Sequence, residues 1–337
     1  MRRAGFLTWH RRAALLFAPL LLLQALTGAV LLFHAPLEQA IYPVPGNADV
    51  LPVSRLIDAA AKAIPQARVT RLYLPETADD AARAELVTSD GAMRFVALDA
   101  ATARVVRVGG YAAFPLEAAL QWHYRLMSGT TGLAVVLVNG LVLVFMAGSG
   151  LAYWWPTRGR FAKSLAINPR MPGRVRLRQW HRSGGVIASI VLLFSAGTGV
   201  LLAAPDVWSA PAVAEPVFVA MPEQVDAAVA VAQAQFPQAR IRDVRFPQAD
   251  RLTINFFAPE RNARAVHVVA VQLSAPEVLK RQPAATNDVL WMKVLPLHTG
   301  ESFGLAGQLV LLVEALVLAA LAISGPWMWW QARRLRK

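Results

Sequence analysis

Residues 9–33, WHRRAALLFAPLLLLQALTGAVLLF, and residues 180–204, WHRSGGVIASIVLLFSAGTGVLLAA, decide the fold of this 337-residue chain. Each stretch begins with Trp-His-Arg, continues as an apolar run and carries Thr-Gly near its end. About 20 helical residues span a hydrocarbon core that is about 30 Å thick. Each stretch is therefore expected to form a transmembrane helix, and the two align without a gap from the Trp-His-Arg motif to Thr-Gly.

Two further apolar stretches complete a set of four. The expected spans are Ala13–Phe33, Leu133–Trp155, Gly185–Ala204 and Leu305–Trp330. The composition agrees, because 56% of the residues are hydrophobic and only 16% are charged, whereas soluble domains carry about a quarter charged residues. The chain is thus expected to be a membrane protein with a four-helix transmembrane bundle.

The match between the two halves extends well beyond the first motif. With almost the same shift along the chain, Pro65-Gln66-Ala67-Arg68 matches Pro237-Gln238-Ala239-Arg240. Further on, His123 matches His298 and Trp154-Trp155 matches Trp329-Trp330. Motifs aligned along the whole chain indicate a tandem duplication, in which each unit is a helix, an external domain and a second helix.

Charge orients these units. The segments 1–12 and 156–182 and the tail after Gln331 contain 16 of the 34 basic residues and no acidic residue. Positively charged flanks remain in the cytoplasm, so both termini are expected there and the long loops outside. In a bacterial-type envelope that outside is the periplasm. This distribution also argues against nucleic-acid binding.

The expected organisation is 1–34 N-terminus and first span, 35–122 first periplasmic domain, 123–156 second span, 157–180 basic cytoplasmic loop, 181–204 third span, 205–297 second periplasmic domain, 298–330 fourth span and 331–337 basic tail.

The two long loops have the pattern of small α/β domains. Helical periodicity covers Ser54–Ile64 and Glu223–Phe236, and short alternating stretches predict strands. The expected strands are Arg68–Leu74, Ala84–Thr88, Met93–Leu98, Arg240–Phe246, Arg251–Phe257 and Val266–Leu273.

Several classes of chemistry are excluded. The chain has no cysteine, which rules out disulfides, thiolate catalysis, iron–sulfur clusters and covalently attached c-type haem. It contains neither a P-loop nor a dinucleotide-binding fingerprint. No catalytic acid, base or nucleophile can be assigned from its motifs.

Four of the six histidines form two pairs related by the repeat. His10 and His181 begin the first and third spans on the cytoplasmic side, and His123 and His298 precede the second and fourth on the external side. Imidazole is a good iron ligand, and bundle interiors commonly hold cofactors. Two pairs at two depths suit two b-type haems, each with two axial histidines.

The remaining candidates are open to more than one interpretation. His34 ends the first span and could replace a member of the external pair or simply lie among lipid headgroups, and His267 is expected to be structural. Glu314 falls within the fourth span, where an ionisable group is costly and often functional. It could serve a proton path, a propionate or quinone contact, or a hydrogen bond between helices. Glycines beside the external pair could let a flat macrocycle approach the backbone, and these are Gly129, Gly132, Gly304 and Gly307.

In these motifs the chain resembles the PepSY-associated transmembrane proteins of bacterial inner membranes, which include ferric-siderophore reductases. The resemblance covers nearly the whole chain and rests on motifs with fixed spacing. They are Trp9-His10-Arg11 with Leu26-Thr27-Gly28, Gln121-Trp122-His123 with the run from Gly148 to Pro156, Trp180-His181-Arg182 with Gly197-Thr198-Gly199, and Leu297-His298-Thr299-Gly300 with Phe303-Gly304.

The resemblance implies two PepSY-like periplasmic domains and haem held between helices by His10 with His181 and by His123 with His298. Electrons from a membrane quinol or a separate cytoplasmic reductase would reduce a periplasmic ferric siderophore or other ferric chelate and release Fe(II). Two alternatives remain open. The chain could be a membrane-anchored binding or regulatory module without haem, or a haem-bearing subunit of a separate redox enzyme.

Overall fold

The computed structural model describes residues 3–46, 49–209, 221–248 and 250–334. The chain forms two compact units. The bundle unit comprises residues 1–32, 119–209 and 294–337, and the sheet unit comprises residues 33–118 and 210–293. Each is described by itself.

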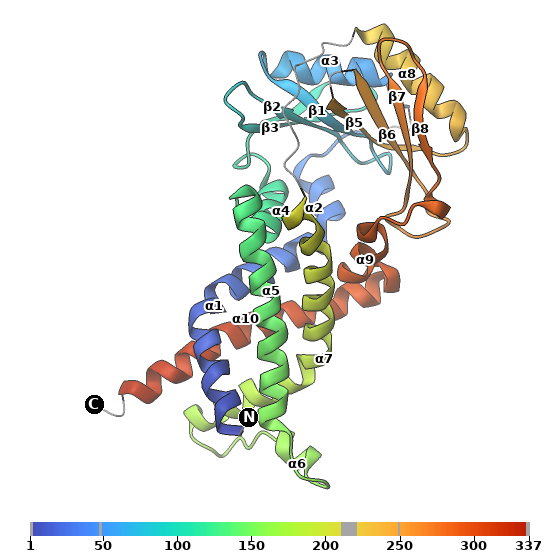
Figure 1. Ribbon diagram of the computed structural model, residues 1–337. Helices are drawn as coiled ribbons and strands as arrows, with labels where there is room; N and C mark the ends of the chain where they lie inside the picture. The colour runs from blue at the N-terminus through green and yellow to red at the C-terminus, as the bar shows by residue number, and fades with distance from the viewer. Residues whose placement is uncertain (1–2, 47–48, 210–220, 249, 335–337) are drawn as a thin grey trace. The chain divides into compact units, whose positions relative to one another are not determined.

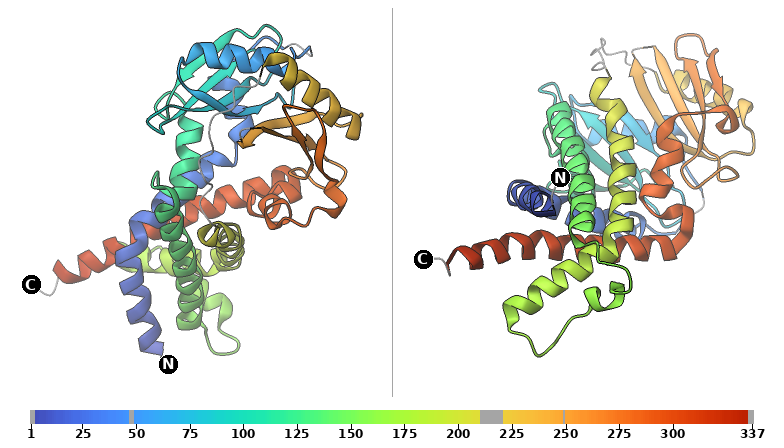
Figure 2. Two further views of the ribbon diagram at one scale, coloured as in Figure 1. Left: turned by 45° about the horizontal axis from the view of Figure 1, so that its top comes forward. Right: turned by 60° about the horizontal axis from the view of Figure 1, so that its bottom comes forward.

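The bundle unit contains four helices that are long and apolar enough to cross a membrane. They are α1 (Arg3–Leu31), α5 (Gly129–Trp154), α7 (Gly173–Trp208) and α10 (Gly304–Arg334). Helix α5 packs against α1 and α7, and α10 packs against the same two helices. In the right-hand view of Figure 2, the green helix α5 lies between the blue α1 and the yellow-green α7. The four therefore form a closed ring, which confirms the expected membrane helices; α7 begins well before its apolar run.

Two shorter helices lead into α5 and α10. Helix α4 (Pro115–Arg125) ends at a tight turn before α5, in which Leu126, Met127 and Gly129 have positive φ. Helix α9 (Leu290–His298) is followed by the 3₁₀ turn η2 (Glu301–Phe303) before α10. A short helix, α6 (Phe161–Leu165), lies in the basic segment before α7.

The sheet unit is built on one eight-stranded antiparallel sheet of order β4-β3-β2-β1-β5-β6-β7-β8. Its strands are β1 (Arg68–Tyr73), β2 (Ala82–Val87), β3 (Met93–Leu98), β4 (Val105–Gly109), β5 (Ile241–Gln248), β6 (Arg251–Phe257), β7 (Val266–Gln272) and β8 (Val278–Gln282). Its helices are α2 (His34–Ile41), α3 (Val53–Ala63) and α8 (Pro222–Gln235), with the 3₁₀ turn η1 (Ala284–Thr286). The two halves of the chain thus contribute four strands each, in the same order outward from the centre (Figure 1).

The two halves meet where β1 pairs with β5. Leu72 lies opposite Val244, Arg71 opposite Arg245 and Tyr73 opposite Asp243. Leu72 and Val244 are also equivalent residues in the alignment of the two halves, in which Pro65 matches Pro237. Equivalent residues therefore face each other across a local twofold axis at the centre of the sheet.

Helices α3 and α8 cover one face of this sheet (Figure 1). Alternate residues of the strands point toward them, and the side chains of Leu72, Leu86, Val244 and Ile254 are fully buried there. At the same twofold axis, the Ser54 hydroxyl donates a hydrogen bond to the Asp226 carboxylate at 2.6 Å. Ser54 and Asp226 are equivalent positions under the same alignment.

The sequence predicted most of these helices and strands, but not that the strands of both halves form one sheet. Helices α3 and α8 and six strands lie within a few residues of their expected ranges. Strands β4 and β8 were not expected, because they are edge strands whose residues are mostly exposed and lack alternation. The two expected α/β domains share one continuous sheet instead of forming two separate ones.

Candidate functional site

Four histidines of the bundle unit lie against neighbouring helices in matched ways. His10 is on α1 and His181 on α7, whereas His123 is near the end of α4 and His298 is the last residue of α9. We call His10 with His181 the first pair and His123 with His298 the second pair.

The rings of the second pair lie close together. Their centroids are 6.3 Å apart and their planes are inclined by 49°. In each pair the two histidines come from opposite halves of the chain.

Each histidine is oriented by a hydroxyl group of a neighbouring helix. The Nδ1 atoms of His123 and His298 lie 3.0 Å from the hydroxyl oxygens of Thr27 and Thr198. These hydroxyls donate their protons to backbone carbonyls of their own helices, as is common for threonine. The hydroxyl oxygen must then accept, so Nδ1–H of each imidazole donates to it.

The first pair has the same arrangement with serine in place of threonine. The Nδ1 atom of His181 lies 2.7 Å from Ser324 Oγ. The Nδ1 atom of His10 lies 3.2 Å from Ser149 Oγ and 3.1 Å from the Met146 carbonyl, which can only accept. The Ser149 and Ser324 hydroxyls donate to backbone carbonyls of their own helices, as the two threonines do. This hydrogen-bond pattern assigns the proton of all four imidazoles to Nδ1, which leaves the Nε2 lone pair available to a metal, as in metal-binding histidines generally.

A glycine follows each of these hydroxyl residues and lets its helix approach the imidazole. A Cβ at Gly28 or Gly199 would lie 3.1 or 3.2 Å from Cε1 of the second-pair histidine that it faces. A Cβ at Gly150 or Gly325 would lie 3.4 Å from Cε1 of the first-pair histidine. Four hydroxyl–glycine dipeptides therefore form four matched cradles, one for each ring, and these are Thr27-Gly28, Ser149-Gly150, Thr198-Gly199 and Ser324-Gly325.

These cradles fit a metal that brings its own equatorial ligands. Within the described residues, no group of three or more His, Asp or Glu side chains could hold a bare ion. Metal–imidazole nitrogen bonds are about 2 Å long, so two rings on opposite sides of one iron have centroids roughly 6 Å apart. The 6.3 Å separation in the second pair agrees with that value. This is the separation that the two axial histidines of a planar macrocycle such as haem require, and the first pair has the same hydroxyl and glycine partners.

Two of the glycines that were expected to let a macrocycle approach, Gly132 and Gly307, pack against backbone. A Cβ on Gly132 would lie 1.7 Å from the carbonyl oxygen of Arg125, and one on Gly307 would lie 2.3 Å from that of Gly300. Both glycines pack against the backbone of the preceding turn, so they hold the ends of α4 and α9 against α5 and α10. This packing by itself requires glycine at both positions, and the glycines whose Cβ position faces a histidine ring are Gly28, Gly150, Gly199 and Gly325.

His34 lies in the sheet unit, among carboxylates. Its ring nitrogens are 3.4 Å from Glu38 and 3.8 Å from Glu117. Arg83 bridges the same two carboxylates at 2.8 and 2.6 Å. Burial opposes ionisation of Glu117, but Arg83 and His34 outweigh it and lower the pKa of that carboxyl. The structure therefore gives His34 a place in a charge cluster apart from the four cradles.

His267 is packed as a structural residue. Its ring stacks on Phe236 with centroids 4.2 Å apart, and its Nδ1 accepts a hydrogen bond from the Ala284 backbone at 2.9 Å.

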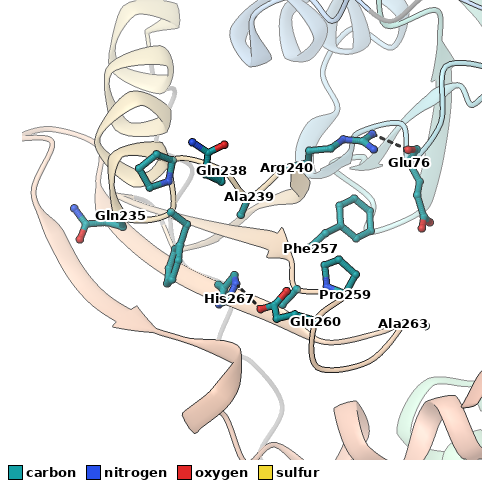
Figure 3. Close-up of a pocket in the computed structure, with 13 residues that line it drawn as sticks. Glu76, Gln235, Gln238, Ala239, Arg240, Phe257, Pro259, Glu260, Ala263 and His267 are labelled. Carbon is teal, nitrogen blue, oxygen red and sulfur yellow. Dashed lines mark hydrogen bonds and ion pairs between the residues drawn. The ribbon is translucent and has the colours of Figure 1, made fainter.

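His267 also lines a pocket of about 770 Å³ in the sheet unit (Figure 3). Its aromatic wall includes Phe257, and Glu76 and Glu260 add carboxylates. The Arg240 guanidinium points to Glu76 and donates to its backbone carbonyl at 2.6 Å.

Glu314 lies in the interior of the bundle unit. Only 8% of its surface is exposed, and within the described residues it has no hydrogen-bond or ion-pair partner. Its equivalent in the first half, Asn139, is buried as well, and the Asn139 Oδ1 atom lacks a hydrogen-bond partner among the described residues.

Comparison with known proteins agrees with this architecture. The model of the PepSY-associated TM region matches residues 7–332. No curated protein matches the chain. Since the family match covers all four membrane helices and the whole sheet unit, the chain belongs to the PepSY-associated transmembrane family.

Proposed function

We propose that this protein carries electrons across a bacterial inner membrane through two b-type haems and delivers them to a ferric siderophore or another ferric chelate. His10 and His181 hold one haem, and His123 and His298 hold the other. The observation that carries the proposal is the set of four matched cradles, in which every Nδ1–H is hydrogen-bonded and every ring lies against a glycine.

One-electron exchange is the chemistry that a bound haem supplies. The residues of this chain orient the ligands and fix their tautomer, which raises the basicity of Nε2. The glycines keep side chains away from the rings, and the apolar helices exclude water from the interior of the bundle. No acid or base is required at the substrate, because the reduction of Fe(III) to Fe(II) in a chelate adds only an electron to the iron.

The spacing of the cradles suits passage across a membrane. On α1, His10 belongs to the first pair, and Thr27, further along the same helix, belongs to the second. At about 1.5 Å per helical residue the two levels are about 25 Å apart, which is comparable with the hydrocarbon core. The first pair then lies near the cytoplasmic side, together with the basic segments, and both termini are cytoplasmic.

A tandem duplication explains why the cradles match. Each half supplies one histidine to each pair and four strands to the sheet, and the sheet halves meet across a local twofold axis. The sheet unit is periplasmic in this arrangement and presents the docking surface for the ferric chelate.

The proposed reaction is balanced by one electron per iron. A quinol supplies two electrons and releases two protons, so one quinol reduces two Fe(III) chelates in turn, whereas a cytoplasmic reductase can supply the electrons singly. Haem held by the first and second pairs would supply the one-electron exchange between this donor and Fe(III), and Fe(II) would leave the weakened complex. Iron is the substrate here, and haem is the resident cofactor.

The test is the absorption spectrum of the purified protein, oxidised and dithionite-reduced, with haem quantified per chain. We expect two low-spin b haems. His10→Ala and His181→Ala should remove one haem, and His123→Ala and His298→Ala the other. The control variant His267→Ala should retain both. The reduced protein should then be reoxidised by a ferric siderophore.

The outcomes separate the alternatives. Absence of haem in cells that are well supplied with it would overturn the proposal and favour a membrane-anchored binding module. Two haems without oxidation by any ferric chelate would instead indicate the haem-bearing subunit of another redox enzyme.

A further inference from the structure

Glu314 is an ionisable residue inside the bundle to which the proposed electron path assigns no role. Helix α10 places it ahead of Ser324, the hydroxyl residue of the His181 cradle. Their spacing corresponds to about 15 Å along the helix. Toward the other end of α10, Gly307 contacts the backbone of Gly300, two residues after His298. Gly307 precedes Glu314 by about 10 Å along the same helix, so Glu314 lies between the two pairs.

The bundle at this level is apolar apart from Glu314 and Asn139. Asn139 precedes Ser149 on α5 by the same spacing and therefore occupies the equivalent level. On the other two helices this level is occupied by Leu21 and Leu192, which are buried. One carboxyl and one amide thus interrupt an otherwise hydrocarbon layer.

No other ionisable side chain faces Glu314 from the helices packed around it. Between the two levels these helices comprise residues 13–27, 132–148, 185–198 and 307–323, and the sequence of these stretches contains no Lys, Arg, His or Asp and no other Glu. The charge of Glu314 therefore depends on the bundle environment and on the charge of whatever the histidine pairs hold.

A buried carboxylate without a partner is unfavourable unless a positive charge is nearby. A ferric haem with two neutral imidazoles has one net positive charge at its centre, which is lost when the iron is reduced. A unit charge at about 10–15 Å, with an effective dielectric constant of about 20, changes the proton affinity of a carboxyl about tenfold. The oxidised state then favours the carboxylate, and the reduced state favours the acid.

We propose that Glu314 is a proton-binding site that takes up one proton when an electron enters the bundle and releases it when the electron leaves. When the iron held by a histidine pair gains an electron, the Glu314 carboxylate takes up one proton from the bulk solution and becomes a carboxylic acid. When the electron leaves, the acid returns that proton. This inference rests on the proposed function, since it requires haem at the histidine pairs.

The first experiment is a spectroelectrochemical titration of both haems in the full-length holoprotein at a series of pH values. In the wild type the midpoint potentials should fall with rising pH, by up to about 59 mV, which corresponds to a tenfold change in a one-electron equilibrium. In Glu314→Gln the potentials should not change across the same range. Asn139→Gln is the matched control and should keep the slope of the wild type.

A second variant separates proton binding from a structural role. The exchange Asn139→Glu with Glu314→Asn moves the carboxyl to the equivalent position in the other half, at a similar level between the pairs. It should restore the pH slope that Glu314→Gln loses. A slope that survives in Glu314→Gln belongs to another group and would overturn the inference.

The infrared difference spectrum of the wild type, reduced minus oxidised, tests the same point without any variant. We expect a positive band from the C=O stretch of a protonated carboxyl, shifted in deuterated water. Its absence would overturn the inference even where a variant failed to assemble. Failure of the proposed function is a distinct result, because the wild type would then contain no haem to titrate.

Discussion

The two halves of the chain are alike in the bundle and unlike at the centre of the sheet. In the bundle, equivalent positions hold the same residue at each histidine and at each hydroxyl–glycine cradle. At the twofold axis of the sheet, equivalent positions hold different residues that bond to each other. Ser54 pairs with Asp226, and Arg71 pairs with Asp243 at 2.9 Å.

The geometry explains this difference. At a twofold axis, equivalent positions of the two halves lie next to each other. The same charged residue at both positions would therefore repel, whereas an arginine at one and an aspartate at the other attract. Residues that reach one shared atom from opposite sides do best when both are the same ligand. Matched histidines therefore suit a common iron, and mismatched charges suit a junction between two protein surfaces.

The largest effect is expected where the mismatched charges are most concentrated. Asp243 is fully buried and accepts bonds from Arg71, Arg242 and Arg245. Replacing it with alanine leaves these cations close together without a counter-charge, and breaking a buried ion pair in this way costs about 3–5 kcal/mol. We expect Asp243→Ala to lower strongly the melting temperature of the full-length protein, measured by circular dichroism.

A matched control lies at the surface of the same unit. Asp288 forms an ion pair with Lys293 at 2.7 Å, but its side chain is 81% exposed. Asp288→Ala should change the melting temperature little, since exposed ion pairs contribute little to stability. Equal losses in the two variants would show that the centre of the sheet does not depend on its mismatched charges.

The next effect tests the matched side of the comparison. Thr27→Val removes the acceptor for the Nδ1–H of His123 and keeps the shape of the side chain. Loss of such an outer partner typically weakens metal binding about 10–100-fold. Thr198→Val should have the same effect through His298, and haem titration of the apoprotein measures both.

Ser189→Ala serves as the control for these variants. The Ser189 hydroxyl is buried and bonds to a carbonyl of its own helix, but not to a histidine. If Thr27→Val and Ser189→Ala had equal haem affinities, the hydroxyl groups would have no part in orienting the ligands.

A smaller effect is expected from the cradle glycines. Gly28→Ala would place a methyl group 3.1 Å from Cε1 of His123, which requires the ring to move by a few tenths of an ångström. Overpacking of this kind costs about 1 kcal/mol at the low end of its range, or roughly a fivefold loss of haem affinity. Gly150→Ala, with 3.4 Å of space, should be milder.

Two glycines in the same bundle provide controls for this series. A Cβ on Gly148 or Gly197 would have no neighbour within 4 Å. Gly148→Ala and Gly197→Ala should leave haem affinity unchanged. A loss of affinity in these variants equal to that in Gly28→Ala would assign the effect to helix flexibility and not to the ring contact.

Part of the candidate site could be predicted from the sequence. The four histidines and the dipeptides Thr27-Gly28 and Ser149-Gly150 were visible as repeated motifs, because helices preserve their spacing along the chain. That a dipeptide in one helix orients a histidine far along the chain was not visible, since this contact depends on how the helices pack.

The sheet was harder to predict. The strands β4 and β8 escaped detection because exposed edge strands lack alternation. The single continuous sheet escaped detection because the pairing of β1 with β5 joins segments that are far apart in the sequence. The alignment of the two halves already matched Leu72 with Val244. That these two residues pair across β1 and β5 follows only from the twofold arrangement of the folded sheet.

The smallest expected effect is the loss of stability at acidic pH, which should differ between the sheet unit and the bundle unit. The arginines around Asp243 hold the pKa of its carboxyl far below the ordinary value of 3.8 despite burial, and Arg83 lowers the pKa of Glu117. A lowered pKa in the folded state gives stability that is present above the unfolded value and is lost as the pH falls through the folded one. The melting temperature should therefore decrease as the pH falls below about 4.5, and Asp243→Asn should flatten this dependence. Since the helices between the histidine pairs contain no aspartate, the haem spectrum should persist at a pH where the sheet has begun to unfold, and simultaneous loss of both signals would show that the two units unfold as one.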